Sequence, residues 1–220
     1  MRDGDNIREV AALGVDYIGM IFYPKSPRFV NMISTHAGII PDKVSTPQHN
    51  HEGTALVGVF VDEMPQNIIT RVVNFKLDVI QLHGNESPTL IRNLRATIDP
   101  DLRPGIQIWK TIALPASSDR DACRQAFADA RQYESCADAL LFDTSTPTKG
   151  GSGQHFDWSV LGDYDGALPF MLSGGIGPDD AALLCAFSHP KCMGIDLNSR
   201  FETAPGMKDV QKIKSFLEQL

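Results

Sequence analysis

Residues 140–158 join an acidic side chain to a glycine-rich loop. The apolar run from Leu140 to Phe142 ends at Asp143, and the sequence Gly-Gly-Ser-Gly follows at 150–153. A carboxyl group at the end of a strand can donate a proton to a substrate, and the N–H groups of a glycine-rich loop can bind an anion. We therefore expect Asp143 to be a catalytic acid, the alternative being a turn or helix-capping residue.

Two segments near the end of the chain have the composition of a phosphate-binding site. Each follows an apolar run: Ser173, Gly174 and Gly175 form the first, and Asp196, Asn198 and Ser199 the second. Parallel α/β barrels often bind phosphate through loops after their last two strands, where glycine allows close approach and a helix N-terminus adds positive potential. Either segment alone could be an ordinary turn. Because the two segments follow the last two apolar runs, we favour a phosphate-binding site.

Apolar runs alternate with amphipathic segments along the chain. The runs are mostly continuous, as in strands buried on both faces of a parallel sheet. We expect strands at 17–23, 56–61, 79–83, 106–112, 139–143, 169–172 and 193–197. Helices are expected at 6–13, 65–75, 88–98, 119–134, 178–187 and 208–220, the first opened by a capping box at Asn6 and Glu9 and the third by Ser87 as N-cap.

This alternation predicts an α/β fold, either a (β/α)8 barrel or an open doubly wound sheet. Polar residues follow several different strands, which favours the barrel, because an open sheet concentrates its ligand at one switch point. Seven strands are visible, one fewer than a barrel needs. We expect one domain over residues 1–220, with an irregular or short helix at 31–53.

Composition and charge limit which classes of partner the protein can have. The net charge of −7 and the pI near 5.3 disfavour nucleic acid or an anionic membrane, and the lack of an apolar run of membrane-spanning length favours the cytoplasm. The four cysteines are scattered and are expected to be free thiols, mostly buried. His49 and His51 lie in a polar segment without carboxylate or thiol neighbours, so we expect them to bind no metal. We also expect no cofactor.

Several motifs in order resemble the phosphoribosylanthranilate isomerase family over nearly the whole chain. They are Ala11 to Gly19, Phe22 to Arg28, Val57 to Val61, Gln81 to Gly84, Asp143 with Gly150 to Gly153, Phe156 to Trp158, Ser173 to Gly175, Asp196 with Ser199 and Glu202, and Pro205 to Asp209. The succession of Ser-Pro-Arg, Gln-Leu-His-Gly and Gly-Gly-Ser-Gly is more specific than any one motif.

The resemblance implies an Amadori rearrangement of N-(5-phosphoribosyl)anthranilate in tryptophan biosynthesis, by a monomer or homodimer acting on a phosphorylated small molecule. Asp143 would be the general acid, which must hold a proton near neutral pH and would be helped by partial desolvation. Arg28 would bind the anthranilate carboxylate, a role that suits a guanidinium. His83 would order the site. The substrate's other contacts would come from Gly151, Gly153, Ser173, Gly174, Gly175, Asp196, Asn198 and Ser199.

The chain departs from the family's pattern at its start. The family opens with a strand whose cysteine is the general base, and the printed sequence begins at what resembles the last residue of that motif. We therefore expect the chain as given to lack the first strand and its cysteine, and to have reduced activity. Two alternatives stay open: a non-catalytic barrel that binds a phosphorylated ligand, and another sugar-phosphate enzyme, for which Lys110 at a strand end is the only lysine so placed.

Overall fold

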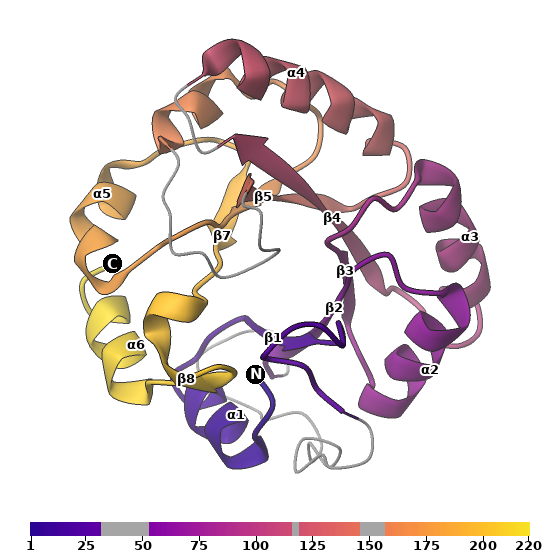
Figure 1. Ribbon diagram of the computed structural model, residues 1–220, viewed down its shortest axis with the longest axis horizontal. Helices are drawn as coiled ribbons and strands as arrows, with labels where there is room; N and C mark the ends of the chain where they lie inside the picture. Colours follow the sequence, from indigo (N-terminus) through magenta and orange to yellow (C-terminus); the bar gives the residue numbers. More distant parts are fainter. Residues whose placement is uncertain (32–52, 116–118, 146–156) are drawn as a thin grey trace. The chain divides into compact units, whose positions relative to one another are not determined.

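The computed structural model describes residues 1–31, 53–115, 119–145 and 157–220. The chain divides into two compact units. Unit 1 comprises residues Met1–Ile108 and Glu202–Lys214, and unit 2 comprises Trp109–Phe201 and Ser215–Leu220. Figure 1 labels their helices and strands.

Unit 1 is built on three parallel strands that pair in chain order. They are β1 (Tyr17–Ile21), β2 (Ala55–Phe60) and β3 (Val79–Leu82), with Gly19 opposite Val57 and Val57 opposite Val79. The helices are α1 (Gly4–Ala11), α2 (Pro65–Phe75) and α3 (Pro88–Ile98), of which α2 and α3 lie side by side (Figure 1). An antiparallel hairpin, β8 (Glu202–Ala204) and β9 (Met207–Lys208), leads into α6 (Val210–Leu217).

Unit 2 holds four parallel strands, also paired in chain order. They are β4 (Gln107–Pro115, which starts in unit 1), β5 (Ala139–Ser145), β6 (Phe170–Leu172) and β7 (Cys192–Ile195). Two α-helices, α4 (Arg120–Ala130) and α5 (Ala181–Ala186), accompany them. Short 3-10 helices are η2 (Arg131–Tyr133), η3 (Trp158–Asp163), η4 (Pro178–Asp180) and η5 (Ser199–Phe201).

Local sequence explains where the regular elements begin and end. Pro65 and Pro88 occupy the first turn of α2 and α3, where a missing N–H costs nothing, and the Ser87 hydroxyl accepts a hydrogen bond from the N–H of Leu90 at 3.3 Å. Helix α2 ends at Phe75, and the next residue, its C-cap Lys76, is in the left-handed conformation. All seven expected strands are present, and the expected α/β class is confirmed.

Three expectations about local structure are wrong. Helix α1 is capped by Asp3, whose carboxylate accepts from the N–H of Asn6, so Asn6 is inside the helix and forms no capping box. The expected helix at 208–220 starts only at Val210, because the preceding residues form the β8–β9 hairpin. Lys110 lies within β4 rather than at its end; it is buried, and its ammonium donates to the carbonyl of Thr111 at 3.0 Å.

Each unit has an aromatic core. In unit 1 the ring of Phe22 lies 5.3 Å from that of Phe60 and 4.9 Å from that of Phe75. In unit 2 the ring of Tyr164 lies 5.1 Å from Phe142 and 5.5 Å from Phe170, both edge-on. Edge-to-face packing of this kind adds to the stabilisation from burial itself. These rings fix the strands whose ends carry the polar residues of interest.

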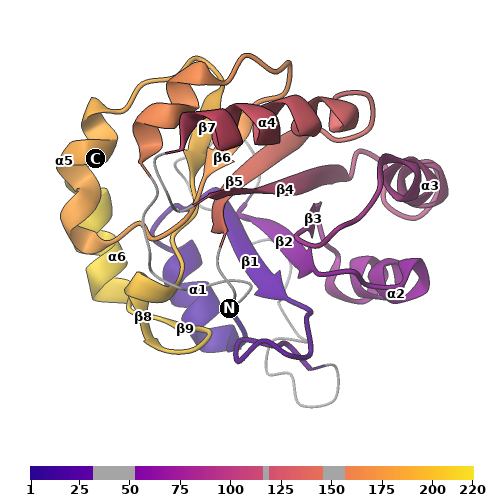
Figure 2. The same ribbon diagram turned by 45° about the horizontal axis from the view of Figure 1, so that its top comes forward.

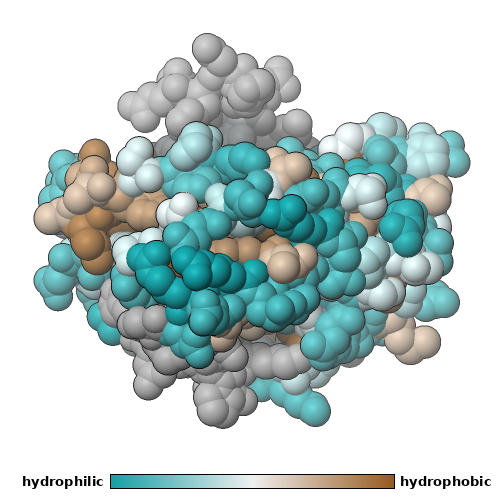
Figure 3. Space-filling model, turned by 90° about the horizontal axis from the view of Figure 1, so that it is seen from above, coloured by the Kyte–Doolittle hydropathy of each residue, from teal (hydrophilic) through white to brown (hydrophobic). Residues whose placement is uncertain are grey.

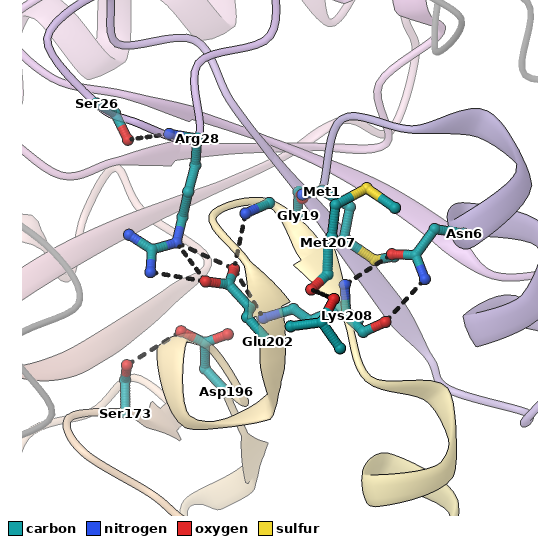
Figure 4. A network of polar contacts seen from close by, with 12 residues as sticks. Met1, Asn6, Gly19, Ser26, Arg28, Ser173, Asp196, Glu202, Met207 and Lys208 are labelled. Carbon is teal, nitrogen blue, oxygen red and sulfur yellow. Dashed lines mark hydrogen bonds and ion pairs between the residues drawn. The ribbon is translucent and has the colours of Figure 1, made fainter.

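The start of the chain packs against β1. The N-terminus lies close to β1 in Figure 2. Met1 is buried, and its ammonium group donates to the carbonyl of Gly19; both residues are labelled in Figure 4. Figure 3 shows a face that is largely hydrophilic, as the acidic composition leads one to expect. Among the described helices, none is long and apolar enough to cross a bilayer.

Candidate active site

The carboxyl ends of three neighbouring strands of unit 2 bring Asp143, Ser173 and Asp196 together. Phe142 of β5 is opposite Leu172 of β6, and the N–H of Ser173 donates to the carbonyl of Phe142 at 2.9 Å. The N–H of Asp196, which follows β7, donates to the carbonyl of Leu172 at 2.8 Å. Polar residues that are far apart in the sequence thus lie at or just after three adjacent strand ends, as expected for a barrel site.

Asp143 lies near the carboxyl end of β5, two residues before the strand ends at Ser145. Its side chain is half-buried, and its Oδ1 accepts a hydrogen bond from the N–H of Thr144 at 2.9 Å. This bond fixes one carboxyl oxygen of Asp143 against the backbone of the strand end. A carboxyl group so held is in a position to deliver a proton to a ligand seated on the same strand ends.

Gly174 comes very close to Asp143 and Thr144. A β-carbon at this position would lie 2.4 Å from the Thr144 hydroxyl oxygen and 3.3 Å from Asp143 Oδ1. Gly174 also has φ +91°, and Gly175 follows with φ +74°, in a region that favours glycine. Two successive glycines in this conformation give the backbone the turn from which N–H groups can face an anion.

The side chain of Ser173 is buried and donates to Asp196 Oδ2 at 3.0 Å, a bond drawn in Figure 4. Asp196 therefore acts here as an acceptor that joins the loops after β6 and β7. Asn198 and Ser199 follow, and the carbonyl of Asn198 accepts from the N–H of Phe201 at 3.1 Å, at the start of η5.

Arg200 was missed by sequence reasoning. A β-carbon on Gly177, just beyond the two glycines, would lie 2.9 Å from Arg200 Cδ and 3.1 Å from its Nη1. The loop after β7 thus places a guanidinium against the loop after β6. Its position immediately after Asn198 and Ser199 was the only sequence signal that pointed to it.

Arg28, the expected carboxylate anchor in unit 1, is bound to Glu202 of the β8–β9 hairpin. Its Nε lies 3.0 Å from both carboxylate oxygens, and its Nη2 lies 2.7 Å from Oε2 (Figure 4). Lys208 Nζ lies 3.6 Å from the other oxygen, Oε1. Sequence reasoning assigned no role to Glu202 or Lys208. No local sequence pattern indicates that a residue after β7 pairs with Arg28.

Glu202 is ionised in this setting. Its burial alone would raise its pKa, but the hydrogen bonds from Arg28 and the positive charges of Lys208 and Arg28 outweigh that effect and hold the pKa below its ordinary value. The Arg28, Lys208 and Glu202 side chains are 12%, 10% and 5% exposed, so this cluster is largely shielded from solvent screening.

His83 follows β3 in unit 1. Its ring Nδ1 lies 3.3 Å from Gln81 Nε2, and Gln81 is buried. An amide nitrogen can only donate, so Nδ1 accepts this bond and the proton of the neutral ring is on Nε2. The backbone just after His83 is held by Glu86. The buried carboxylate of Glu86 accepts from the N–H groups of Gly84 and Asp62, each at 2.9 Å.

Gly151 and Gly153, expected to bind substrate, and His49 and His51 lie outside the described residues. Within the described part of the chain, no group of three or more histidine, cysteine or acidic side chains is arranged to hold a metal ion.

The cysteines are free, as expected, but not all are buried. Cys123 and Cys136 are buried, Cys185 on α5 is exposed, and Cys192 is half-buried at the start of β7. Burial raises the pKa of the Cys123 and Cys192 thiols, which disfavours the thiolate that a general base needs.

Comparison with known proteins agrees with this arrangement. The family model described as N-(5′-phosphoribosyl)anthranilate (PRA) isomerase matches residues 1–219. N-(5′-phosphoribosyl)anthranilate isomerases of Parabacteroides distasonis and Phocaeicola vulgatus are 41% and 38% identical over 220 residues, covering all of this chain and 90% and 94% of those proteins.

Solved structures show the same fold. The phosphoribosyl anthranilate isomerase of Thermotoga maritima matches with a TM-score of 0.77 at 29% identity, and an isomerase in complex with reduced 1-(o-carboxyphenylamino)-1-deoxyribulose 5-phosphate matches with 0.74 at 27%; each match covers 100% of this chain and 94% of the other. A dimeric Thermotoga maritima enzyme, solved as monomers, matches with 0.71 at 29% identity, covering 98% and 91%. The (β/α)8-barrel class expected from the sequence is thereby confirmed, and the chain belongs to the N-(5′-phosphoribosyl)anthranilate isomerase family.

Proposed function

We propose that this chain isomerises N-(5′-phosphoribosyl)anthranilate, its family's reaction in tryptophan biosynthesis, with Asp143 as the general acid. The observation that carries the assignment is the approach of Gly174 to Asp143 at the ends of β6 and β5. It puts the carboxyl group beside a glycine turn suited to an anion. Asp143 would protonate the ring oxygen of the ribose as the bond from that oxygen to C1 breaks, which gives an open-chain Schiff base.

The remaining groups of unit 2 are proposed to hold the phosphate. Gly174 and Gly175 would supply backbone N–H groups, with Asn198 and Ser199 from the neighbouring loop, while Ser173 and Asp196 fix the two loops to each other. Arg200 supports this assignment, since its guanidinium is a positive side chain packed against the loop after β6. Gly151 and Gly153 stay predicted substrate contacts.

Unit 1 is proposed to supply Arg28 for the carboxylate of the anthranilate ring and His83 as an ordering residue. The rearrangement also needs a base that removes the proton from C2. None of the four cysteines follows the carboxyl end of a described strand, and two have raised pKa values, so we assign that step to none of them. A cytoplasmic location and a monomer or homodimer are part of the proposal; the dimeric Thermotoga maritima relative supports the homodimer.

The test is the rate of isomerisation, followed by loss of the substrate's anthranilate fluorescence. Asp143→Asn keeps the shape of the side chain but removes the proton donor, so kcat should fall by roughly 100- to 10,000-fold. Asp129→Asn, on the exposed side of α4, is the matched control and should leave kcat unchanged. Normal turnover by Asp143→Asn would show that another group is the acid.

A further inference from the structure

The ring of His83, at the carboxyl end of β3, is in contact with the side chain of Gln81 in that strand. Side chains two residues apart in an extended chain lie on the same face, and here Gln81 Nε2 lies 3.3 Å from His83 Nδ1. Gln81 is 7% exposed, whereas His83 is half-buried. The contact therefore joins an amide enclosed in the core to a ring that a ligand can reach.

The backbone that carries the ring is also fixed. The N–H of His83 donates to the carbonyl of Phe60, the last residue of β2, at 2.8 Å. The next N–H, that of Gly84, donates to the buried carboxylate of Glu86 at 2.9 Å. A β-carbon on Gly84 would lie 2.6 Å from the backbone nitrogen of Asp62, so the ends of β2 and β3 are packed closely together. The backbone bonds and the contact at Nδ1 together hold the ring of His83 in one orientation.

The contact with Gln81 also decides which ring nitrogen of His83 carries the proton. An amide nitrogen donates and cannot accept, so Nδ1 is the unprotonated nitrogen and the neutral ring has its proton on Nε2. A reversed amide would present its carbonyl oxygen to Nδ1–H, and Nε2 would then be the acceptor. The orientation of one buried amide thus determines whether His83 offers a donor or an acceptor at Nε2.

We propose that Gln81 is a positioning residue that holds His83 in the Nε2–H tautomer, and that this N–H donates a hydrogen bond to an oxygen of the substrate's sugar. The inference rests on the proposed function and deepens it, because it states what His83 gives to the ligand. Barrel enzymes bind their substrates at the carboxyl ends of the strands, where His83 lies. The phosphate and the ring carboxylate have other partners in the proposed function, which leaves the uncharged oxygens of the sugar for a neutral N–H donor.

The tautomer can be measured directly by ¹⁵N NMR of the histidine side chains at about pH 8, where an ordinary imidazole is neutral. We expect His83 to have an unprotonated Nδ1 and a protonated Nε2, and His83→Gln identifies its signals by their loss. His189 is the internal reference for this form of the ring. Its Nδ1 accepts from the N–H of Lys191 at 3.1 Å, and its Nε2 lies 3.2 Å from the carbonyl of Tyr164. A proton on Nδ1 of His83 would overturn the inference.

Gln81→Glu tests the role of the amide, because a carboxylate accepts from Nδ1–H and so reverses the tautomer. Binding of reduced 1-(o-carboxyphenylamino)-1-deoxyribulose 5-phosphate, measured by calorimetry at a pH where the spectrum shows a neutral ring, should weaken about tenfold with the loss of the donor. Gln66→Glu, which adds the same charge on the exposed side of α2, is the control and should change neither the tautomer nor the binding. Unchanged binding by a Gln81→Glu variant with its proton on Nδ1 would contradict the proposal.

Two substitutions of His83 test the donor itself. A glutamine amide reaches the position of Nε2 and an asparagine amide reaches that of Nδ1, so His83→Asn should bind the same ligand about tenfold more weakly than His83→Gln. Gln81→Glu should have little further effect in His83→Gln, which has no tautomer to set. Equal weakening by both His83 variants, or an undiminished effect of Gln81→Glu in His83→Gln, would overturn the inference. Failure of the unsubstituted chain to bind the ligand would instead count against the proposed function.

Discussion

Gly174 packs so tightly on Thr144 that a β-carbon at residue 174 would come within 2.4 Å of the Thr144 hydroxyl oxygen. The contact links the loop after β6 to the strand end that carries Asp143. It makes glycine necessary at position 174 for two reasons, the lack of space and the positive φ.

Gly174→Ala should therefore lower both stability and kcat. The left-handed backbone alone costs about 1–3 kcal/mol for an ordinary residue, and relief of the contact must move Thr144 and, with it, Asp143. Gly105→Ala separates these effects, since Gly105 has φ +76° but open space around it. Urea unfolding and steady-state kinetics of the two variants measure the difference; equal losses of stability with normal kcat would show that the close contact is unimportant.

Glu202 should make stability depend on pH in the acid range. Its pKa in the folded protein is lowered, so its contribution is present above the ordinary glutamate value of about 4.3 and is lost as the pH falls through the lowered value. The difference in unfolding free energy between the unsubstituted chain and Glu202→Gln should accordingly be largest near neutral pH and shrink below pH 4. In an Arg28→Met background the same difference should be smaller. A pH-independent difference contradicts the ion-pair explanation.

Tyr164 should produce the opposite dependence in alkali. Burial is the main cause that raises its pKa to about 12, so its contribution is intact below pH 10 and is lost as the pH rises toward 12. Tyr164→Phe removes the bond from its hydroxyl to the carbonyl of Leu168, worth about 0.5–1.5 kcal/mol near neutral pH. The variant's deficit should diminish between about pH 10 and 12 in urea unfolding curves, and a deficit that grows with pH would be the wrong sign.

Glu86 should be a strong stabiliser of the loops after β2 and β3. Glu86→Ala removes the buried carboxylate that accepts from the N–H groups of Asp62 and Gly84, which should cost more than about 2 kcal/mol. Glu86→Gln keeps one acceptor oxygen and should cost less. Glu63→Ala, which removes an exposed carboxylate that also accepts a backbone N–H, is the control and should cost less than either. Thermal or urea unfolding ranks the three, and a Glu86→Ala variant as stable as Glu63→Ala would refute this role.

Much of the fold can be predicted from local sequence. Helices α2 and α3 have the predicted limits, because proline and serine at their starts and buried apolar residues at helical spacing are local signals. The seven strands follow from continuous apolar runs. Asp143, Ser173 and Asp196 could be placed at one end of neighbouring strands for the same reason, since parallel strands carry their carboxyl ends to one edge.

What only the tertiary structure decided is which partner each polar side chain takes. Asn6 has the sequence context of a helix cap, yet its amide is bound to Lys208, 202 residues away, and Asp3 caps the helix instead. Arg28 has the context of an exposed cation after proline, yet its partner is Glu202, 174 residues away. Propensities and periodicity act over a few residues, whereas a buried hydrogen bond or ion pair is chosen by the chain segments that packing brings together. The sequence by itself therefore determined the strands, most of the helices and the acid at a strand end, and the tertiary structure determined what holds Arg28 in place.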